Sequence, residues 1–330
     1  MKKNVRLVDI AEKLDLTKVS VSKALRDHPD ISENTREKVK KVAREMGYRP
    51  NLVARSLTSQ KSQTIGVIIP KMANYFFAPV IEGIYNSANN SDYEVVLGIS
   101  LEDEKLEKKH IESMLNMRVD GLLVSITEQT KDPERFDIVR EMGIDLVFFD
   151  RGFSNAGFTY IKVDDRNSAK AGVKYLIDSG FKNIAHIAGY EGVEIGKERK
   201  AGYLESMREA SVEIPDEAIV QGGYSEKDGY LCFEKLLNQY GKPDALFAVT
   251  YPVGLGALEY MNEHGINPKD VTILAFGGSE FNKHLVNPFI CIEQPTYDLG
   301  RRAFRQIEKE MNSKSQPEPQ IIELTAKLSR

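Results

Sequence analysis

The chain has 330 residues, of which 41% are hydrophobic and 28% are charged, with a formal net charge of −4. This is the composition of a soluble globular protein with room for two or three domains. The longest apolar runs, such as residues 64–70, have the length of a strand, and the N-terminus does not have the pattern of a signal peptide. We therefore expect a cytoplasmic protein that does not enter a membrane.

Few residues suggest enzyme chemistry. Cys232 and Cys291 have no Cys or His neighbour at metal-ligand spacing, and we interpret both as buried thiols of a reducing compartment. The five histidines are scattered, and none accompanies an obvious nucleophile. The sequence therefore predicts no metal site, no cofactor and no catalytic residue.

Positive charge is concentrated at the front of the chain. Residues 1–62 hold 15 Lys and Arg against 8 Asp and Glu, a net charge of +7, whereas the rest of the chain has a net charge of −11. A small basic module on an acidic body predicts a polyanionic partner for the front module alone. A solvated basic surface without a partner is the alternative.

Three short helices are predicted in this front module. The first has Ile10 and Leu14 on one face, the second follows Thr17 as its N-cap, and the third runs from Ser32 as N-cap to Gly47. The first two helices are joined by a tight turn, which is typical of a helix-turn-helix motif. An ordinary three-helix bundle is the alternative.

The outward face of the second helix suits DNA. Residues near the N-terminus of such a helix usually meet base edges, where Lys donates to guanine and Val contacts the thymine methyl group. Other basic and hydroxyl side chains hold phosphates. The candidates for base contacts are Thr17, Lys18, Val19, Ser22 and Lys23, and those for phosphate contacts are Arg6, Arg26, Ser32 and Thr35.

A fourth, shorter helix is predicted after Pro50, with Asn51 as its N-cap. It has only about two turns, and an isolated helix of that length is marginal in water. The pattern therefore indicates a helix that forms only when something else stabilises it.

From residue 63 onward, strand-like and helix-like segments alternate, as in TIGVIIP followed by FFAPVIEGIYNSANN. This alternation predicts doubly wound parallel sheets, and about ten strand candidates predict two lobes with a ligand cleft between them. We interpret Asp164 and Asp165 as a strand end and a helix N-cap, not as an acid/base pair. The GLGALE segment, residues 254–259, lacks the third glycine of a dinucleotide-binding motif.

Several segments together resemble LacI/GalR-type bacterial transcription regulators. They are LVDIAEKLDLTKVSVSKAL, ISENTREKVKKVAREMGYRPNLVARSL, TIGVIIP, VDGLLV, GKERKAGYLESM and the FGG that precedes IEQPTYDLG. The resemblance covers nearly the whole chain, from about residue 5 to residue 328. It implies a small all-α helix-turn-helix headpiece followed by a two-lobed α/β body of the periplasmic-binding-protein-like, doubly wound type.

The resemblance also implies limits for each part. The helix-turn-helix domain would span residues 1–48, and the linker with its hinge helix residues 49–62. The effector-binding and dimerisation domain would span residues 63–330. Its lobe 1 would comprise about 63–163 and 293–325, and its lobe 2 about 164–292.

Members of this family are homodimers that bind a pseudo-palindromic double-stranded operator, most often as repressors. In the family, the linker helices of two copies meet in the minor groove, and a leucine from each wedges between base pairs. The resemblance assigns that helix to Asn51 through about Ser59, with Leu57 as the wedge and Ala54 beside it. The free energy lost by unstacking the base pairs is offset because the bent duplex contacts more protein.

The resemblance further implies a small-molecule effector, expected to be a carbohydrate or a derivative, between the lobes. Arg199 lies in the R-x-x-G-[YW] pattern whose arginine grips the effector in many relatives, and Tyr224 matches a stacking aromatic. The full set of candidate effector residues is Phe76, Phe77, Asp150, Arg151, Arg199, Tyr224, Thr250, Tyr251, Gly277 and Gln294. The two Phe could instead be core residues, and Asp150 with Arg151 a structural pair.

Some positions depart from the sugar-binding pattern of the family. Thr250 and Tyr251 stand where Asn-Asp is usual, and Gly277 stands where Asp is usual. Losing these groups removes partners for sugar hydroxyls. We therefore expect a less polar cleft, with a non-sugar effector or a protein co-effector as alternatives.

Two other classes of function share features with this sequence. A solute-binding receptor for transport shares the body, but the basic front module argues against it. A doubly wound enzyme would need a phosphate-binding loop or a catalytic constellation, and the sequence has neither. The prediction is therefore a transcription regulator that is not an enzyme.

Overall fold

The computed structural model describes residues 5–48, 61–72, 75–278, 280–313 and 318–329. Contacts within the chain separate residues 1–62 from residues 63–330. Each of these two units is described by itself below.

The first unit, called the headpiece here, contains three helices in its described part: α1 (Leu7–Leu14), α2 (Lys18–Leu25) and α3 (Glu33–Met46). Their ends follow from the capping residues. The Thr17 side chain accepts a hydrogen bond from the backbone N–H of Ser20, and the Ser32 side chain accepts one from that of Thr35. Gly47 ends α3 at φ +71°, a left-handed conformation that glycine adopts without strain. The predicted helix-turn-helix is thus confirmed.

The headpiece core is small. Its six buried hydrophobic side chains are between 0% and 4% exposed: Ile10, Ala11, Val21, Ala24, Val39 and Ala43. Asp15, the residue between α1 and the next segment, has φ 51° and ψ 45°, so the tight turn uses a left-handed aspartate.

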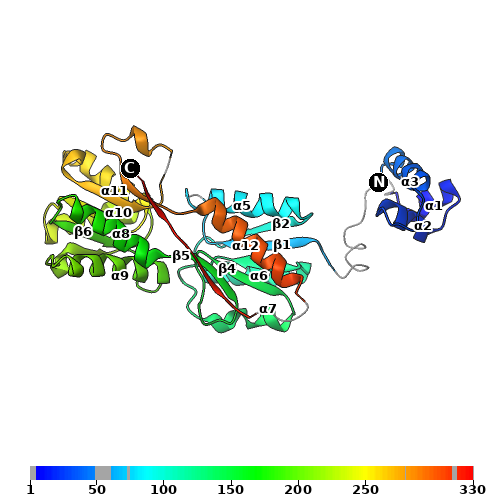
Figure 1. The fold of residues 1–330 in the computed structure, drawn as a ribbon, viewed down its shortest axis with the longest axis horizontal. Helices are drawn as coiled ribbons and strands as arrows, with labels where there is room; N and C mark the ends of the chain where they lie inside the picture. Colours follow the sequence, from blue (N-terminus) through cyan, green and yellow to red (C-terminus); the bar gives the residue numbers. More distant parts are fainter. Residues whose placement is uncertain (1–4, 49–60, 73–74, 279, 314–317, 330) are drawn as a thin grey trace. The chain divides into compact units, whose positions relative to one another are not determined.

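The second unit, called the body, has two six-stranded sheets with helices on both faces (Figure 1). The first sheet has the order β11-β5-β4-β3-β1-β2 and is parallel at every pairing in the described residues. Its strands are β1 (Thr64–Ile69), β2 (Glu94–Ile99), β3 (Gly121–Val124), β4 (Asp145–Phe149), β5 (Thr159–Val163) and β11 (Ile321–Leu324). With its helices this sheet forms lobe 1.

Alternating residues of β1 explain the layers of lobe 1. Ile65, Val67 and Ile69 pack in one cluster with α5 (Phe77–Asn90) and α12 (Thr296–Met311). Ile68 packs in the cluster on the opposite face with α6 (Glu104–Met117) and α7 (Asp137–Glu141). A short 3₁₀ helix, η1 (Pro133–Phe136), precedes α7.

Lobe 2 repeats this plan. Its sheet has the order β12-β10-β9-β8-β6-β7 and is parallel except for the antiparallel pair β10 and β12. The strands are β6 (Ile184–Ala188), β7 (Ile219–Gln221), β8 (Ala245–Ala248), β9 (Thr272–Phe276), β10 (Ile290–Glu293) and β12 (Lys327–Ser329). The helices are α8 (Asp165–Asp178), α9 (Glu194–Glu209), α10 (Glu226–Gln239) and α11 (Tyr251–Glu263), with 3₁₀ turns η2 (Asp216–Ala218), η3 (Pro268–Asp270) and η4 (Asn282–His284).

The chain passes between the lobes three times within the described residues. It leaves lobe 1 between β5 and α8, returns between β10 and α12, and leaves again between β11 and β12. In Figure 1 the C-terminal segment runs across both lobes. The predicted doubly wound, two-lobed architecture is confirmed, and strands β5, β10, β11 and β12 are additions to the predicted ones.

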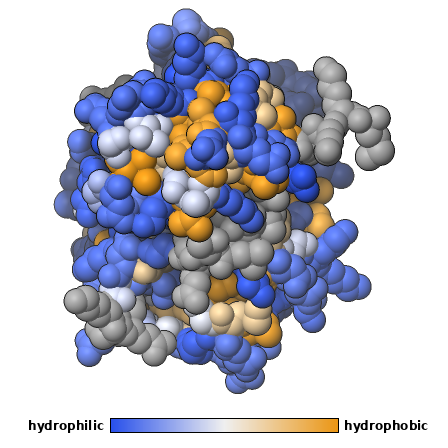
Figure 2. All heavy atoms as spheres, turned by 90° about the vertical axis from the view of Figure 1, so that its right-hand side faces the viewer, coloured by the Kyte–Doolittle hydropathy of each residue, from blue (hydrophilic) through white to orange (hydrophobic). Residues whose placement is uncertain are grey.

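The described residues contain no helix that is long and apolar enough to cross a membrane. The surface view agrees with the polar composition: on the face drawn in Figure 2, hydrophilic residues dominate, and hydrophobic ones appear as patches among them.

Candidate DNA-binding surface and ligand cleft

The exposed start of α2 is the first candidate site. Capping by Thr17 fixes where the helix begins, and the next two residues, Lys18 and Val19, are both exposed. Val19 is 65% exposed, although a valine gains by burial. An exposed valine beside an exposed lysine is what contact with base edges in a major groove requires.

Other candidates already have partners within the headpiece. The Nζ of Lys23 donates to Oδ2 of Asp30 at 2.7 Å, and this contact lowers the pKa of Asp30. The guanidinium of Arg6 lies 3.6 Å from the carboxylate of Asp9, and the Nε of Arg26 donates to the carbonyl of Ser22 at 3.2 Å. A DNA contact by Lys23 therefore has to compete with Asp30.

The side chain of Ser22, on α2, is half-buried, and the other DNA candidates divide into two groups. Ser32 and Thr35 lie at the start of α3, where their hydroxyl oxygens are 2.9 Å apart, so both serve the helix cap. Asn51, Ala54 and Leu57 lie outside the described residues.

The second candidate site is a cleft of about 770 Å³ between the lobes. Its lining comes from the loop before α5 and from α5 itself, from the ends of β4, β8, β9 and β10, and from α9. Eight of the ten candidate effector residues line it: Phe76, Asp150, Arg199, Tyr224, Thr250, Tyr251, Gly277 and Gln294.

Phe77 and Arg151 do not line this cleft. Phe77 is 1% exposed and packs in the lobe 1 core with Val80 and Ile84, so it is a core residue. The Nη1 of Arg151 donates to both carboxylate oxygens of Glu102, at 2.9 and 3.2 Å. Its guanidinium lies 5.3 Å from the ring centre of Tyr224, so it contacts an aromatic side chain that does line the cleft.

Arg199 is held rigidly at the cleft. It is 3% exposed. Its Nε donates to Oδ1 of Asp165 at 2.8 Å, and its Nη1 donates to the carbonyl of Val249 at 2.7 Å. The guanidinium carbon lies 3.8 Å from the ring centre of Phe276. Asp165 is 7% exposed, so this is a buried ion pair whose charges balance one another.

Asp150 is a buried carboxylate with weak partners. It is 7% exposed, and its φ of 60° is left-handed, a strained conformation for a residue other than glycine. Ser125 donates to its Oδ2 at 3.4 Å, and the Nε of Arg151 lies 3.9 Å away. Burial raises the pKa of Asp150 to about 7, although Arg151 opposes that shift.

Two other lining residues, Thr250 and Gly277, shape the backbone around the cleft. The hydroxyl of Thr250 caps α11 and donates to the carbonyl of Tyr224 at 3.1 Å, so it fixes the loop that carries this aromatic. Gly277 has φ +85°, a conformation that disfavours every side chain, although a Cβ there would have room. A side chain at this position would be strained by the backbone conformation.

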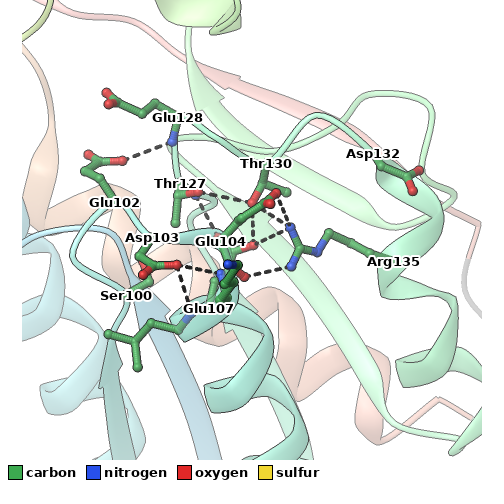
Figure 3. Close-up of polar contacts among 12 residues, drawn as sticks. Ser100, Glu102, Asp103, Glu104, Glu107, Thr127, Glu128, Thr130, Asp132 and Arg135 are labelled. Atoms are coloured by element: carbon green, nitrogen blue, oxygen red, sulfur yellow. Dashed lines mark hydrogen bonds and ion pairs between the residues drawn. The ribbon is translucent and has the colours of Figure 1, made fainter.

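A network of polar groups stiffens the neighbouring wall of lobe 1 (Figure 3). Glu102 accepts the backbone N–H of Glu128 at 3.0 Å, in addition to Arg151. Glu107 is 0% exposed and accepts from the backbone N–H of Thr127 at 2.7 Å and from the hydroxyl of Thr130 at 2.8 Å. The strand ends of lobe 1 are thereby tied to the start of α6.

Several lining residues were not predicted from the sequence. Glu82 on α5, Glu280 after β9 and Glu293 at the end of β10 all line the cleft. They are far apart in the chain, and none belongs to a local motif that marks a site. The role of Asp165 was also missed, because its N-terminal place on α8 was sufficient to explain an aspartate. The described residues contain no cluster of three His, Cys, Asp or Glu that could hold a metal ion.

Comparisons with known proteins match both units. A family model described as "Bacterial regulatory proteins, lacI family" matches residues 6–51, and one described as "Periplasmic binding protein domain" matches residues 65–315. The chain is 31% identical to "Catabolite control protein A" of Priestia megaterium over 94% of both chains. It is 29% identical to "HTH-type transcriptional repressor PurR" of Escherichia coli O139:H28, over 97% of this chain and 94% of that one.

Solved structures agree in fold. The lac repressor dimer bound to operator and the anti-inducer ONPF has a TM-score of 0.87 at 22% identity, covering 99% of this chain and 98% of that one. The complex of the transcriptional regulator CelR with cellobiose has a TM-score of 0.74 at 24% identity and covers 99% of both chains.

Proposed function

The chain belongs to the lacI family of bacterial regulatory proteins, and we propose that it represses transcription by binding a pseudo-palindromic operator as a homodimer. Each α2 lies in a major groove, with Thr17, Lys18 and Val19 toward the bases. A small molecule in the cleft changes operator affinity by moving the lobes and the dimer interface. Since the operator lies on the chromosome, the protein works in the cytoplasm. No catalytic step is assigned to it.

The observation that carries the DNA-binding proposal is the exposed start of α2 on a headpiece with a net charge of +7. Binding to duplex would release counterions, so the affinity should fall steeply as salt rises. A solute-binding receptor would not bind duplex at all.

The test is selection of bound duplexes from a random pool at about physiological salt, using the full chain. An enriched inverted repeat with a fixed centre supports a dimeric operator-binding protein. If no sequence is enriched, the selection is repeated with pooled metabolites to supply a co-repressor. A folded protein that still enriches nothing contradicts the proposal.

We also propose that residues 51–59 form the linker helix of the DNA complex, with Leu57 as the wedge. The change Leu57→Ala should weaken operator binding and reduce the bend of the duplex, because the unstacked step loses its apolar partner. Bend angle is measured by fluorescence energy transfer across the operator. An unchanged bend and affinity would remove the wedge from the proposal.

For the cleft, our working assignment is the effector site, lined by Phe76, Asp150, Arg199, Tyr224 and their neighbours. A relative in this fold was solved with cellobiose, which supports a carbohydrate or a derivative as the effector. Domain limits are proposed at residues 1–48, 49–62 and 63–330, with lobe 1 as about 63–163 and 293–325 and lobe 2 as about 164–292.

A further inference from the structure

Acidic side chains outnumber basic ones in the lining of the cleft. Its lining includes four carboxylates: Glu82, Asp150, Glu280 and Glu293. In the described lining the only cationic side chain is Arg199, and the charge of Arg199 is matched by the buried Asp165 behind it. The cavity therefore presents more negative than positive charge, and the cation nearest Asp150, Arg151 at 3.9 Å, is shared with Glu102. An anionic ligand would be repelled there.

Asp150 is the carboxylate with the greatest need of a partner. The three solvent-accessible glutamates are hydrated, whereas Asp150 is 7% exposed. Its one hydrogen-bond donor, Ser125, lies at 3.4 Å, and the nearby Arg151 is held by Glu102. A buried carboxylate without a strong donor is costly unless a cation approaches it.

Aromatic rings form much of the remaining wall. Tyr75 packs edge-on against Tyr251 with ring centres 6.0 Å apart, and both line the cleft with Phe276. The faces of such rings attract cations. Arg199 already lies over Phe276 at 3.8 Å, which shows this attraction in the same cavity.

We propose that the effector is a small hydroxylated amine, protonated at neutral pH, whose ammonium group binds Asp150 beside the aromatic wall. Amino sugars are the class that fits a cavity of about 770 Å³ with several hydrogen-bond acceptors. This inference rests on the proposed function, since it identifies the ligand of the same cleft. Uronates and sugar phosphates are disfavoured by the four carboxylates.

A neutral sugar is the strongest rival, because its hydroxyl groups also donate to carboxylates. The two differ in charge compensation: only an ammonium group balances the ionised form of Asp150. The charged groups that face Asp150 are Arg151, Arg199 and Asp165. Asp165 is ion-paired with Arg199, although burial raises the pKa of Asp165 as well. The Asp150→Asn variant therefore serves to separate the titration of Asp150 from that of Asp165.

The test is calorimetric titration of the full chain with nine sugars in three matched sets. Each set has the neutral hexose, its 2-amino form and its uronate, for glucose, galactose and mannose. We expect at least one 2-amino form to bind at least about tenfold tighter than its neutral parent, and no uronate to bind. A uronate or neutral hexose that binds as tightly as its amine overturns the proposal, as does no binding by any amine.

Two variants locate the binding group. Asp150→Asn should weaken amine binding by about tenfold or more and change neutral-hexose binding by less than about threefold. Glu259→Gln is the matched control, because Glu259 is exposed on α11 outside the lining and loses the same charge. Thermal melting of both variants verifies that they fold. Equal losses in the two variants would contradict a contact at Asp150.

The pH dependence of binding gives a second measurement. Between about pH 5.5 and pH 7, amine affinity should rise as Asp150 ionises, and this rise should disappear in Asp150→Asn. A flat profile in the wild type overturns the ammonium contact. The selection of duplexes keeps the two proposals separate: an enriched operator without amine binding defeats only the effector assignment, and amine binding without an operator defeats only the DNA-binding function.

Discussion

The headpiece and the cleft place their functional groups in opposite ways. Among the described residues of the headpiece the candidate contacts are exposed or half-exposed, and six hydrophobic side chains are buried beneath them. In the cleft the central groups, Arg199 and Asp150, are almost fully buried. Exposed charges attract a polyanion at little desolvation cost, whereas buried charges discriminate strongly because each needs a partner. The headpiece surface is therefore suited to affinity for DNA, and the cleft is suited to selectivity among small ligands.

The largest expected effect comes from removing one charge of the buried pair. Asp165→Ala leaves the guanidinium of Arg199 uncompensated and should lower the unfolding free energy of the body by about 3–5 kcal/mol. Urea unfolding followed by circular dichroism measures it. The neighbouring Asp164→Ala removes only the N-cap of α8 and should cost about 1 kcal/mol. Equal costs would mean that the buried pair does not differ from a surface cap.

The next effect tests the independence of the headpiece. Ile10 is 0% exposed, so Ile10→Ala should cost about 2–5 kcal/mol, which is a large share of what a domain this small has available. We expect loss of operator binding with unchanged ligand binding in the body. Glu12→Ala, an exposed change on the same helix, is the control. A body that also loses its ligand would show that the two units are energetically coupled.

A smaller effect is expected from the buried carboxylate of the cleft. Burial holds the pKa of Asp150 at about 7, against about 3.9 in an unfolded chain. From about pH 4 to pH 7 the folded state therefore binds more protons than the unfolded state, so this group lowers stability as pH rises.

Asp150→Asn removes that dependence. The variant should be more stable than the wild type at pH 7.5 by about 1–3 kcal/mol and nearly equal to it at pH 4. Thermal or urea unfolding at the two pH values gives the difference. A variant that is less stable at pH 7.5 would show that the carboxylate is well compensated in the folded protein.

The smallest effect sharpens the description of the headpiece as an affinity surface. Asp30→Asn frees the ammonium group of Lys23 and should tighten operator binding by about threefold to tenfold. Glu37→Gln makes the same change of charge at an exposed position on α3 without freeing a lysine, so it should have less effect. Filter binding at several salt concentrations distinguishes them. Equal effects would assign the gain to net charge alone.

Local patterns predicted most of the fold. The three headpiece helices, their caps at Thr17 and Ser32, and the end at Gly47 follow from short-range chemistry that is visible in the sequence. Strand β5 was not predicted because Lys162 interrupts its apolar run, and β10 was not among the predicted strands either. Strands β11 and β12 were not predicted because a short strand near the C-terminus owes its pairing to distant partners. Whether such short segments form strands depends on their pairing with distant strands and not on local propensity.

The cleft was predicted in outline by family resemblance, with fewer polar groups expected at Thr250, Tyr251 and Gly277. Three of its carboxylates were not among the predicted residues. The structure supplies carboxylates from Glu82, Glu280 and Glu293 instead. These residues come from three separate elements, so only the fold brings them together. The same holds for Asp165, whose partner Arg199 is one helix away.

The C-terminal segment joins lobe 1 through β11 and lobe 2 through β12. This has a practical consequence for anyone handling the protein. A tag or truncation at the C-terminus lies next to β12, which pairs with β10 in lobe 2 and follows the crossover from lobe 1. It therefore affects a segment that connects the two lobes. A tag is better placed at the N-terminus and cleaved before DNA is added. A chain that ends after Leu324 would keep β11 and lack β12, so it would have one connection fewer between the lobes.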